Sequence, residues 1–148
     1  MSKKQFEYFK RFEKQIILKE VGLAGQKKIF SGNVLIIGIG GLGCPLLTYL
    51  AASGIGKIGI VDFDKVEISN LNRQTLFNRN DVGKFKVIQA KKVINKINKY
   101  IKLTLFKSKI TKKNIKKICS KFDIICDGSD NYETRYLVND YCLREKKI

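Results

Sequence analysis

The chain has 148 residues, of which 44% are hydrophobic, and this suffices for one domain with a buried core. Thirty basic residues against 13 acidic ones give a formal net charge of +17, which would suit a nucleic acid or an anionic membrane. We nonetheless expect no specific nucleic acid and no membrane as partner. The lysines are scattered over predicted helices without interleaved aromatic residues, and they interrupt every apolar run, so no transmembrane segment or signal peptide is expected.

Cysteine usage narrows the class of protein further. The four cysteines form no C-x-x-C pair and show no metal-ligand spacing; they stand at positions 44, 119, 126 and 142. We therefore expect no zinc site. Without a secretion signal we expect reduced thiols and a cytoplasmic protein, with Cys44 and Cys126 serving as small buried apolar residues.

Hydrophobic periodicity predicts an α/β fold. A helix over residues 5–19 comes first and would place Phe9, Phe12 and Ile16 on one side. Strands and helices then alternate, with strands over 33–38, 57–61, 101–106 and 122–126, and helices over 42–53, 84–98, 112–120 and 131–144. This alternation predicts a Rossmann-like, doubly wound parallel sheet in the order 3-2-1-4. Residues 1–31 would form an N-terminal helical extension, and residues 32–148 the core of a single domain.

A glycine-rich loop, GIGGLG at residues 38–43, follows the first predicted strand, whose residues 34–37 are apolar and mostly β-branched. We expect Gly38 to make the turn and Gly40 to let a phosphate approach the backbone. Gly43 would let the next helix pack closely on the strand. The helix N-terminus offers free N–H groups and a positive dipole to a phosphate, so the loop predicts a nucleotide site.

Asp62 directly follows the second predicted strand, nineteen residues after Gly43. A carboxylate at this place can accept hydrogen bonds from ribose hydroxyls, which makes an NAD-binding module the first interpretation of the loop. A solvated loop aspartate is the simpler alternative.

Polar residues beyond Asp62 favour a triphosphate and its metal over a dinucleotide. They are, in chain order, Asp64, Asn70, Arg73, Lys86 and Asp130. Two cations neutralise more charge than a pyrophosphate carries, and carboxylate oxygens suit Mg²⁺. Simpler roles stay open for three residues: Asn70 as a turn residue, Lys86 as one of many solvated lysines, and Asp130 as the start of a capping box with Glu133. Arg73 is one of only five arginines, so composition alone does not explain it.

With these residues in this order, the sequence resembles the ThiF/MoeB family of adenylating enzymes for ubiquitin-like sulfur carriers, which are related to ubiquitin-activating enzymes. The resemblance runs from residue 11 to about residue 143. It rests on six motifs: RFEKQI at 11–16, the glycine loop at 38–43, DFD at 62–64, SNLNRQ at 69–74, VGKFK at 82–86 and DGSDN at 127–131.

The resemblance implies a role for residues of every motif. The phosphates of ATP would meet Gly41 with its neighbours Gly38, Gly40 and Gly43, and the ribose would meet Asp62. Other nucleotide contacts would come from Asp64, Asn70, Arg73, Gln74, Lys86, Asp130, Asn131, Arg11 and Lys14. The catalytic residues would be Arg73, Lys86 and Asp130, and the Mg²⁺ ligands Asp130 and Asp64.

The N-terminal motif departs from the family pattern. The family usually carries an arginine where this chain has Lys14, and lysine lacks the planar bidentate fork. In relatives that residue reaches the triphosphate of the neighbouring subunit, so the resemblance implies a homodimer in which Arg11 and Lys14 act on the partner's site.

The implied reaction is attack by the carrier's C-terminal glycine carboxylate on the α-phosphate of ATP, giving an acyl-adenylate and pyrophosphate. The partner would be a sulfur-carrier protein ending in Gly-Gly, in thiamine or molybdopterin biosynthesis. Family members continue past position 148, and no further strand follows residues 122–126, so we expect an unpaired edge and the absence of the C-terminal part of the family fold. Two alternatives stay open: a truncated nucleotide-binding remnant or subunit without independent catalysis, and an NAD-binding module.

Overall fold

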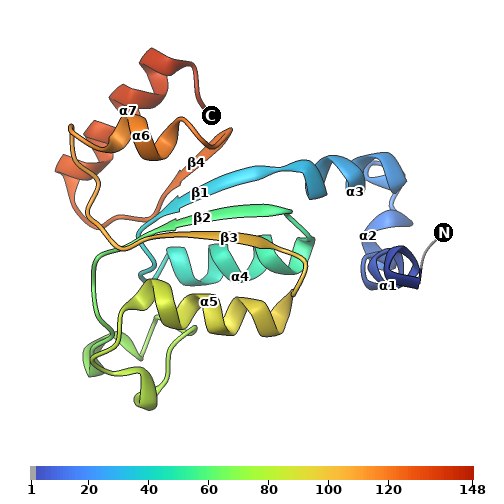
Figure 1. The fold of residues 1–148 in the computed structure, drawn as a ribbon, viewed down its shortest axis with the longest axis horizontal. Helices are drawn as coiled ribbons and strands as arrows, with labels where there is room; N and C mark the ends of the chain where they lie inside the picture. Colours follow the sequence, from blue (N-terminus) through green and yellow to red (C-terminus); the bar gives the residue numbers. More distant parts are fainter. Residues whose placement is uncertain (1–2) are drawn as a thin grey trace.

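The computed structural model describes residues 3–148 and folds around a four-stranded parallel sheet in the order β3-β2-β1-β4 (Figure 1). The strands are β1 (Asn33–Ile37), β2 (Lys57–Val61), β3 (Lys102–Phe106) and β4 (Ile124–Asp127). In the register of the sheet, Val34 of β1 lies beside Ile58 on one side and Ile124 on the other. The predicted fold class and strand order are confirmed.

Helices cover both faces of this sheet (Figure 1). One face carries α4 (Gly43–Ser53) and α5 (Lys86–Ile97), and the other carries α6 (Ile115–Cys119) and α7 (Tyr132–Glu145). The connection from β2 to α5 contains two short 3-10 helices, η1 (Ile68–Asn70) and η2 (Arg79–Asp81). The four helices predicted after the first strand are all present, with ends shifted by a few residues.

The sequence of β1 explains its place in the middle of the sheet. Residues 34–37 are all buried. Ile36 belongs to the core beneath α4 and α5, whereas Leu35 and Ile37 belong to the core beneath α6 and α7. Alternate side chains of a strand point to opposite faces, so a strand covered on both faces has to be apolar throughout. Burial of each such side chain contributes roughly 1.5–3 kcal/mol relative to its exposure.

Phe122 was predicted to start the fourth strand, but it lies before β4. Its N–H donates to the carbonyl oxygen of Cys119 at 3.1 Å, which closes a turn at the end of α6 and delays the strand. The buried ring of Phe122 lies against β2, where a Cβ on Gly59 would overlap it. The absence of a side chain at Gly59 therefore leaves space for the aromatic ring of Phe122, which comes from the segment between α6 and β4.

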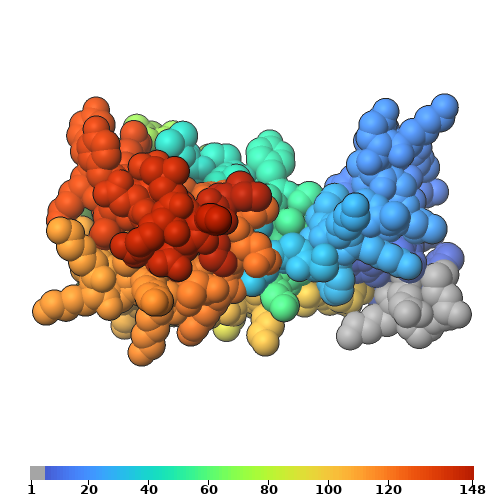
Figure 2. All heavy atoms as spheres, turned by 90° about the horizontal axis from the view of Figure 1, so that it is seen from above, coloured from blue at the N-terminus to red at the C-terminus, as the bar shows by residue number. Residues whose placement is uncertain are grey.

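The N-terminal extension differs from the single helix predicted over residues 5–19. It contains α1 (Lys3–Arg11), α2 (Glu13–Ile16) and α3 (Gly22–Ser31), and it lies at the end of the sheet away from α6 and α7 (Figures 1 and 2). The first helix ends at Arg11, and the buried ring of the next residue, Phe12, approaches Gly54 so closely that a Cβ on Gly54 would lie 2.7 Å from it. Gln26 of α3 is fully buried and accepts a hydrogen bond from Gln15 at 2.7 Å.

The outer edge of β4 is covered in part by the end of the chain, whereas the sequence predicted an unpaired edge. The N–H of Ile125 donates to the carbonyl oxygen of Ile148 at 2.7 Å. Cys44 is buried as predicted, but Cys126 is only half-buried, and all four cysteines are free. Within residues 3–148, every helix is too short or too polar to cross a membrane.

Candidate functional site

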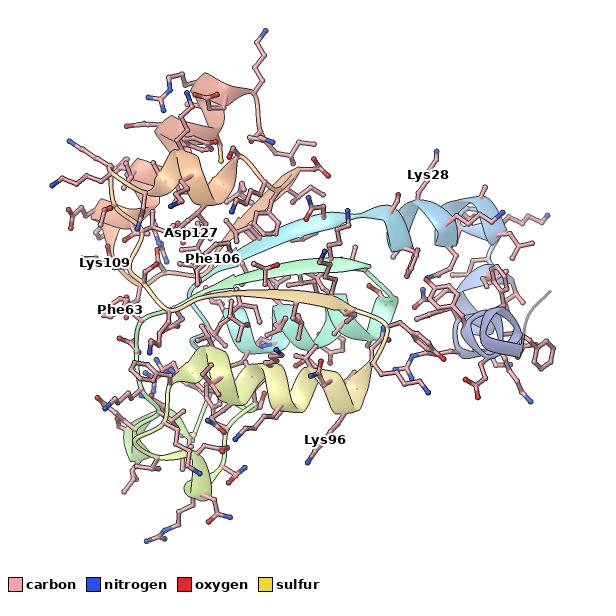
Figure 3. The ribbon with its side chains drawn as sticks, in the orientation of Figure 1. Lys28, Phe63, Lys96, Phe106, Lys109 and Asp127 are labelled. Atoms are coloured by element: carbon pink, nitrogen blue, oxygen red, sulfur yellow. The ribbon has the colours of Figure 1, made fainter. Side chains whose placement is uncertain are left out.

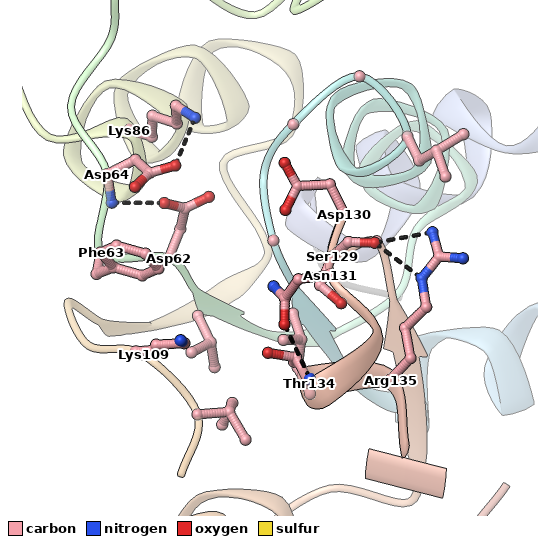
Figure 4. A pocket seen from close by; sticks show the side chains of 18 of the residues that line it. Asp62, Phe63, Asp64, Lys86, Lys109, Ser129, Asp130, Asn131, Thr134 and Arg135 are labelled. Atoms are coloured by element: carbon pink, nitrogen blue, oxygen red, sulfur yellow. Dashed lines mark hydrogen bonds and ion pairs between the residues drawn. The ribbon is translucent and has the colours of Figure 1, made fainter. Parts of the chain in front are cut away.

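A cavity of about 680 Å³ lies at the carboxyl ends of the strands, where doubly wound sheets bind their ligands (Figure 4). Ten of the predicted site residues line it: Gly38, Gly40, Gly41, Asp62, Asp64, Arg73, Gln74, Lys86, Asp130 and Asn131. Four others are absent from its lining: Gly43, Asn70, Arg11 and Lys14. The fold thus brings together five of the six sequence motifs.

Close packing requires two glycines of the loop between β1 and α4. Gly38 has a φ of +85°, and a Cβ there would lie 2.9 Å from the carbonyl oxygen of Gly128, in the turn after β4. A Cβ on Gly43 would overlap the carbonyl oxygen of Gly38. A larger residue at either position would therefore push the backbone apart. Packing within the loop therefore explains a glycine at position 43, and a contact between Gly43 and a nucleotide stays a prediction.

The other two glycines face the cavity. A Cβ on Gly40 would have its nearest neighbour at the Gln74 amide, 3.8 Å away, and one on Gly41 would lie 3.5 Å from the Arg73 side chain. Neither position is closed by packing. Glycine here leaves the backbone N–H groups open to a ligand, as a phosphate cradle requires.

Asp62 ties the end of β2 to the glycine loop. One carboxylate oxygen accepts the N–H of Ile39 at 2.7 Å, and the other accepts the N–H of Asp64 at 2.7 Å (Figure 4). Burial raises the pKa of this carboxyl, while the two N–H groups and nearby Lys86 lower it. Each oxygen keeps a lone pair for a further donor, such as a ribose hydroxyl.

Lys86, the first residue of α5, is not one of the solvated lysines. Its side chain is 7% exposed, and its ammonium group contacts the carboxylate of Asp64 at 3.0 Å (Figure 4). The backbone N–H of Lys86 also donates to the carbonyl oxygen of Asp64 at 3.0 Å. This pair of bonds aims a buried cation at the cavity.

Arg73 and Gln74 enter the cavity from the turn after η1. Arg73 is exposed, and its guanidinium donates to the carbonyl oxygen of Ser69 at 3.0 Å and to the side chain of Asn72 at 3.1 Å. Gln74 is 4% exposed, and its side-chain oxygen has no hydrogen-bond partner among the described residues. A buried amide without a partner, in the wall of a cavity, is suited to a polar ligand.

Asn70 stabilises a turn, which is the simpler of the two roles that its sequence position allowed. Its side-chain oxygen accepts the N–H of Glu67 at 3.1 Å, and the side chain of Glu67 completes a capping box around η1. Asn70 is buried beneath the cavity wall and thereby shapes the segment that presents Arg73. Direct contact of Asn70 with a triphosphate stays a prediction.

The turn after β4 forms the opposite wall. Asn131 is the N-cap of α7, because its side-chain oxygen accepts the N–H of Thr134 at 2.9 Å; the capping box predicted to start at Asp130 is therefore wrong by one residue. The cap at Asn131 leaves Asp130 available. Its carboxylate points into the cavity, and no ion pair or hydrogen bond engages it within residues 3–148 (Figure 4).

Several lining residues were missed by sequence reasoning. Arg135 of α7 lines the cavity and donates two hydrogen bonds to the carbonyl oxygen of Ser129. Lys109, in the loop after β3, also lines the cavity (Figures 3 and 4). Its Nζ atom lies 3.7 Å from the carboxylate Oε2 of Glu133. The other lining residues outside the prediction are Ile37, Leu42, Val61, Phe63, Ser108, Ile110, Gly128, Ser129 and Thr134. Since parallel strands share a carboxyl edge, the loop after the third strand could have been included from topology alone.

Arg11 and Lys14 lie in the extension, away from the cavity of their own chain (Figure 1). The Arg11 guanidinium donates to the carbonyl oxygen of Ile97, at the C-terminal end of α5, where a cation also suits the helix dipole. Lys14 is exposed. A contact between these residues and the site of a second subunit stays a prediction.

The fold defines a Rossmann-like α/β domain with a cavity at the carboxyl edge of its sheet. Comparison with known proteins is more specific: the ThiF family model matches residues 12–148, and the chain belongs to this family.

Among curated relatives, the chain is 46% identical over 142 residues to a probable molybdopterin-synthase adenylyltransferase of Porphyra purpurea, covering 96% of this chain and 37% of the relative. It is 41% identical over 134 residues to a sulfur carrier protein adenylyltransferase of Thermus thermophilus, covering 90% of this chain and 49% of the relative. The chain thus spans between about a third and a half of these relatives.

Solved structures resemble the fold closely. The E. coli tRNA N6-threonylcarbamoyladenosine dehydratase TcdA, in complex with ATP, superposes with a TM-score of 0.90 at 27% identity, over 95% of this chain and 58% of that one. E. coli MccB with ATP gives a TM-score of 0.79 at 30% identity, over 99% of this chain and 51% of that one.

Proposed function

We propose that this chain binds ATP and adenylates the C-terminal glycine carboxylate of a ubiquitin-like sulfur-carrier protein. The observation that carries the proposal is one cavity that combines an open glycine loop, the buried cation of Lys86 and the unengaged carboxylate of Asp130. The names of the two adenylyltransferase relatives and the ATP in the TcdA and MccB complexes support it.

The proposed mechanism needs no protein nucleophile, and the chain contains no histidine. A carboxylate oxygen of the carrier forms a bond to the α-phosphorus, and the bond from that phosphorus to the bridging oxygen of the β-phosphate breaks. Pyrophosphate leaves with the electron pair, and the carrier keeps the adenylyl group. The protein contributes orientation and charge neutralisation, which are sufficient for phosphoryl chemistry of this kind.

Each part of the cavity has a place in that mechanism. The N–H groups of Gly40 and Gly41 and the N-terminus of α4 would hold phosphates, and Asp62 would accept ribose hydroxyls. Arg73 and Lys86 would neutralise the charge that develops on the leaving pyrophosphate. The unpartnered side-chain oxygen of Gln74 would accept a hydrogen bond from a donor of the ligand, such as a hydroxyl group.

The residues present also fit a magnesium ion bound together with the nucleotide. Mg²⁺ is usually held by one or two carboxylates plus substrate phosphates, and within the described residues no cluster of three or more acidic, histidine or cysteine side chains could hold a metal alone. Asp130 would be the main ligand, since Asp64 already pairs with Lys86. When bound, the ion would neutralise phosphate charge.

We also propose which kind of carrier protein the chain acts on and that two copies of the chain form a dimer. The relatives described above are named for molybdopterin synthase and for a sulfur carrier, so we favour a Gly-Gly carrier of that kind, with thiamine synthesis as the second pathway. We also propose a cytoplasmic homodimer, in which Arg11 and Lys14 approach the partner's cavity, because neither lines the cavity of its own chain.

The test is pyrophosphate exchange, with labelled pyrophosphate incorporated into ATP in the presence of a Gly-Gly carrier. We expect exchange with the intact carrier and none with a matched carrier that lacks the terminal glycine. ATP binding without exchange would contradict the adenylyltransferase proposal for this chain and favour a binding subunit. NAD that binds as tightly as ATP in a thermal-shift titration would favour the NAD-binding module.

A second candidate substrate comes from the structural comparison. The TcdA structure has the higher TM-score and is named a dehydratase of a modified tRNA nucleoside, and the charge of +17 would suit RNA. Sequence identity favours the carrier, at 41–46% against 27%. ATP consumption stimulated by tRNA but not by a Gly-Gly carrier would reverse that preference.

A further inference from the structure

We propose that Arg135 is a positioning residue, which fixes the turn after β4 so that the carboxylate of Asp130 is held toward the phosphates and the metal. Arg135 does this through the backbone of Ser129, the residue that precedes Asp130. The inference rests on the proposed function, because it assigns Asp130 to an ATP-bound metal. Neither the six sequence motifs nor the predicted site includes Arg135.

The contact between Arg135 and the turn is made by two donors on one acceptor. The Nε and Nη2 atoms of Arg135 both donate to the carbonyl oxygen of Ser129, at 3.1 and 2.9 Å (Figure 4). Two donors from one planar group fix both the distance and the orientation of the acceptor. Arg135 lies in the first turn of α7, so the guanidinium is anchored to a packed helix.

Other backbone and side-chain groups of the turn, before and after Asp130, are also held by hydrogen bonds. Gly128 donates its N–H to the carbonyl oxygen of Ile37 at 2.8 Å, and Ser129 donates to the carboxylate of Asp127 at 2.8 Å. Asn131 caps α7. Asp130 lies between these fixed points, and its carboxylate points into the cavity (Figure 4).

Removal of the guanidinium would leave the carbonyl of Ser129 without its two side-chain donors and allow the peptide between Ser129 and Asp130 to rotate. The carboxylate would then sample positions away from the cavity. Because Arg135 is exposed and belongs to no hydrophobic core cluster, its loss should disturb this turn without unfolding the domain.

The experiment compares the full chain with Arg135→Ala, Arg135→Lys and Arg144→Ala. The last is a matched control, because Arg144 is an exposed arginine on the same helix that pairs with Glu145 rather than with the turn. ATP affinity is measured by calorimetry with Mg²⁺ and again with EDTA. We expect Mg²⁺ to tighten ATP binding about tenfold less in Arg135→Ala than in the wild type, with Arg135→Lys intermediate and Arg144→Ala unchanged.

Two further measurements separate positioning from general damage. Hydrogen exchange of the ligand-free protein should accelerate in the peptide over residues 127–134 of Arg135→Ala and stay unchanged in Arg144→Ala. In a double-mutant cycle, Asp130→Asn should abolish the magnesium effect, and Arg135→Ala should add no further loss to it.

An unchanged magnesium effect in Arg135→Ala, or additive losses in the cycle, would overturn the positioning role while leaving ATP binding established. Wild-type protein that binds no ATP would instead overturn the proposed function. Equal losses with Mg²⁺ and with EDTA would assign Arg135 to the nucleotide itself and also contradict its action through Asp130.

Discussion

The two walls of the cavity differ in how closely their backbones are packed. In the glycine-loop wall, which Asp62 also ties by a hydrogen bond, Gly38 and Gly43 leave no room for a Cβ. The opposite wall, the turn after β4, is fixed by hydrogen bonds that involve Ser129, Asn131 and Arg135. A wall fixed by contact should tolerate no added atom, whereas a hydrogen-bonded wall should lose order in steps as single bonds are removed.

The strongest test of the packed wall is Gly43→Ala. The new Cβ would overlap a backbone oxygen, which cannot rotate away, so we expect a loss of about 3 kcal/mol in the free energy of unfolding. Thermal and denaturant unfolding of the purified chain would measure it. The control is Gly41→Ala, where the nearest atoms belong to the flexible Arg73 side chain, and where stability should be nearly unchanged while ATP binding weakens. Equal destabilisation by the two substitutions would show that the contact does not distinguish them.

One side chain from each side of the cavity should be indispensable to the reaction. We expect Arg73→Ala and Asp130→Ala each to lower pyrophosphate exchange by about 100-fold or more, since Arg73 would neutralise charge on the leaving group and Asp130 would hold the Mg²⁺ that does so. Both residues are exposed, so the unfolding temperature should stay close to that of the wild type. Exchange rates near those of the wild type would refute the assigned roles.

A smaller loss should follow from removal of one bond in the turn. Asn131→Ala deletes the N-cap of α7, and such a change costs about 1 kcal/mol of stability. Asn131→Asp preserves an acceptor for the N–H of Thr134 and should restore most of it. Denaturant midpoints of the three proteins, at a constant slope, would check the order. A loss as large as that of Gly43→Ala would contradict the contrast between the walls.

The smallest effect should appear on acidification. Burial raises the pKa of Asp62, so the folded chain takes up this proton at a higher pH than the unfolded chain does. Its contribution to stability is therefore greatest at low pH and is lost as the pH rises through the folded-state pKa. Ribose binding needs the carboxylate and follows the opposite trend.

Calorimetry over a pH series would measure that trend. We expect ATP affinity to fall about threefold when Asp62 becomes protonated. This corresponds to the loss of one hydrogen bond with a net contribution of roughly 0.7 kcal/mol. Asp62→Asn should bind more weakly at neutral pH and lack this dependence. The same pH profile in both proteins would assign the titration to another group.

Much of the fold follows from the sequence because the interior strands carry strong local signals. The apolar run at residues 34–37 and its glycine loop could belong to few structures other than a buried parallel strand followed by a helix. The extension was less predictable. The first helix ends at Arg11, before Phe12, whose ring packs on Gly54, a residue far along the chain. The third helix, α3, contains two glycines, which disfavour a helix in the sequence.

The residues of the candidate site also fall into two groups, those that the sequence predicted and those that only the structure revealed. Asp62 and Lys86 were found because Asp62 directly follows β2 and Lys86 begins α5, and both positions lie at the carboxyl edge of the sheet. Arg135 was not found, since its position depends on how α7 packs against the sheet, whereas Lys109 follows β3 and could have been inferred from the topology. The one-residue error at the α7 cap has a similar origin: Asp130 and Asn131 are both good caps, and only the three-dimensional structure distinguishes them.

The ring of Phe122 fills the space that Gly59 leaves on one face of the sheet. The contact reaches from the segment before β4 to β2, across β1, which pairs with both strands. A larger residue at position 59 would overlap the ring, whereas loss of the ring would leave a void above Gly59. The two positions are therefore coupled in packing, and a larger residue at 59 combined with a smaller one at 122 should cost less stability than the two single changes added together.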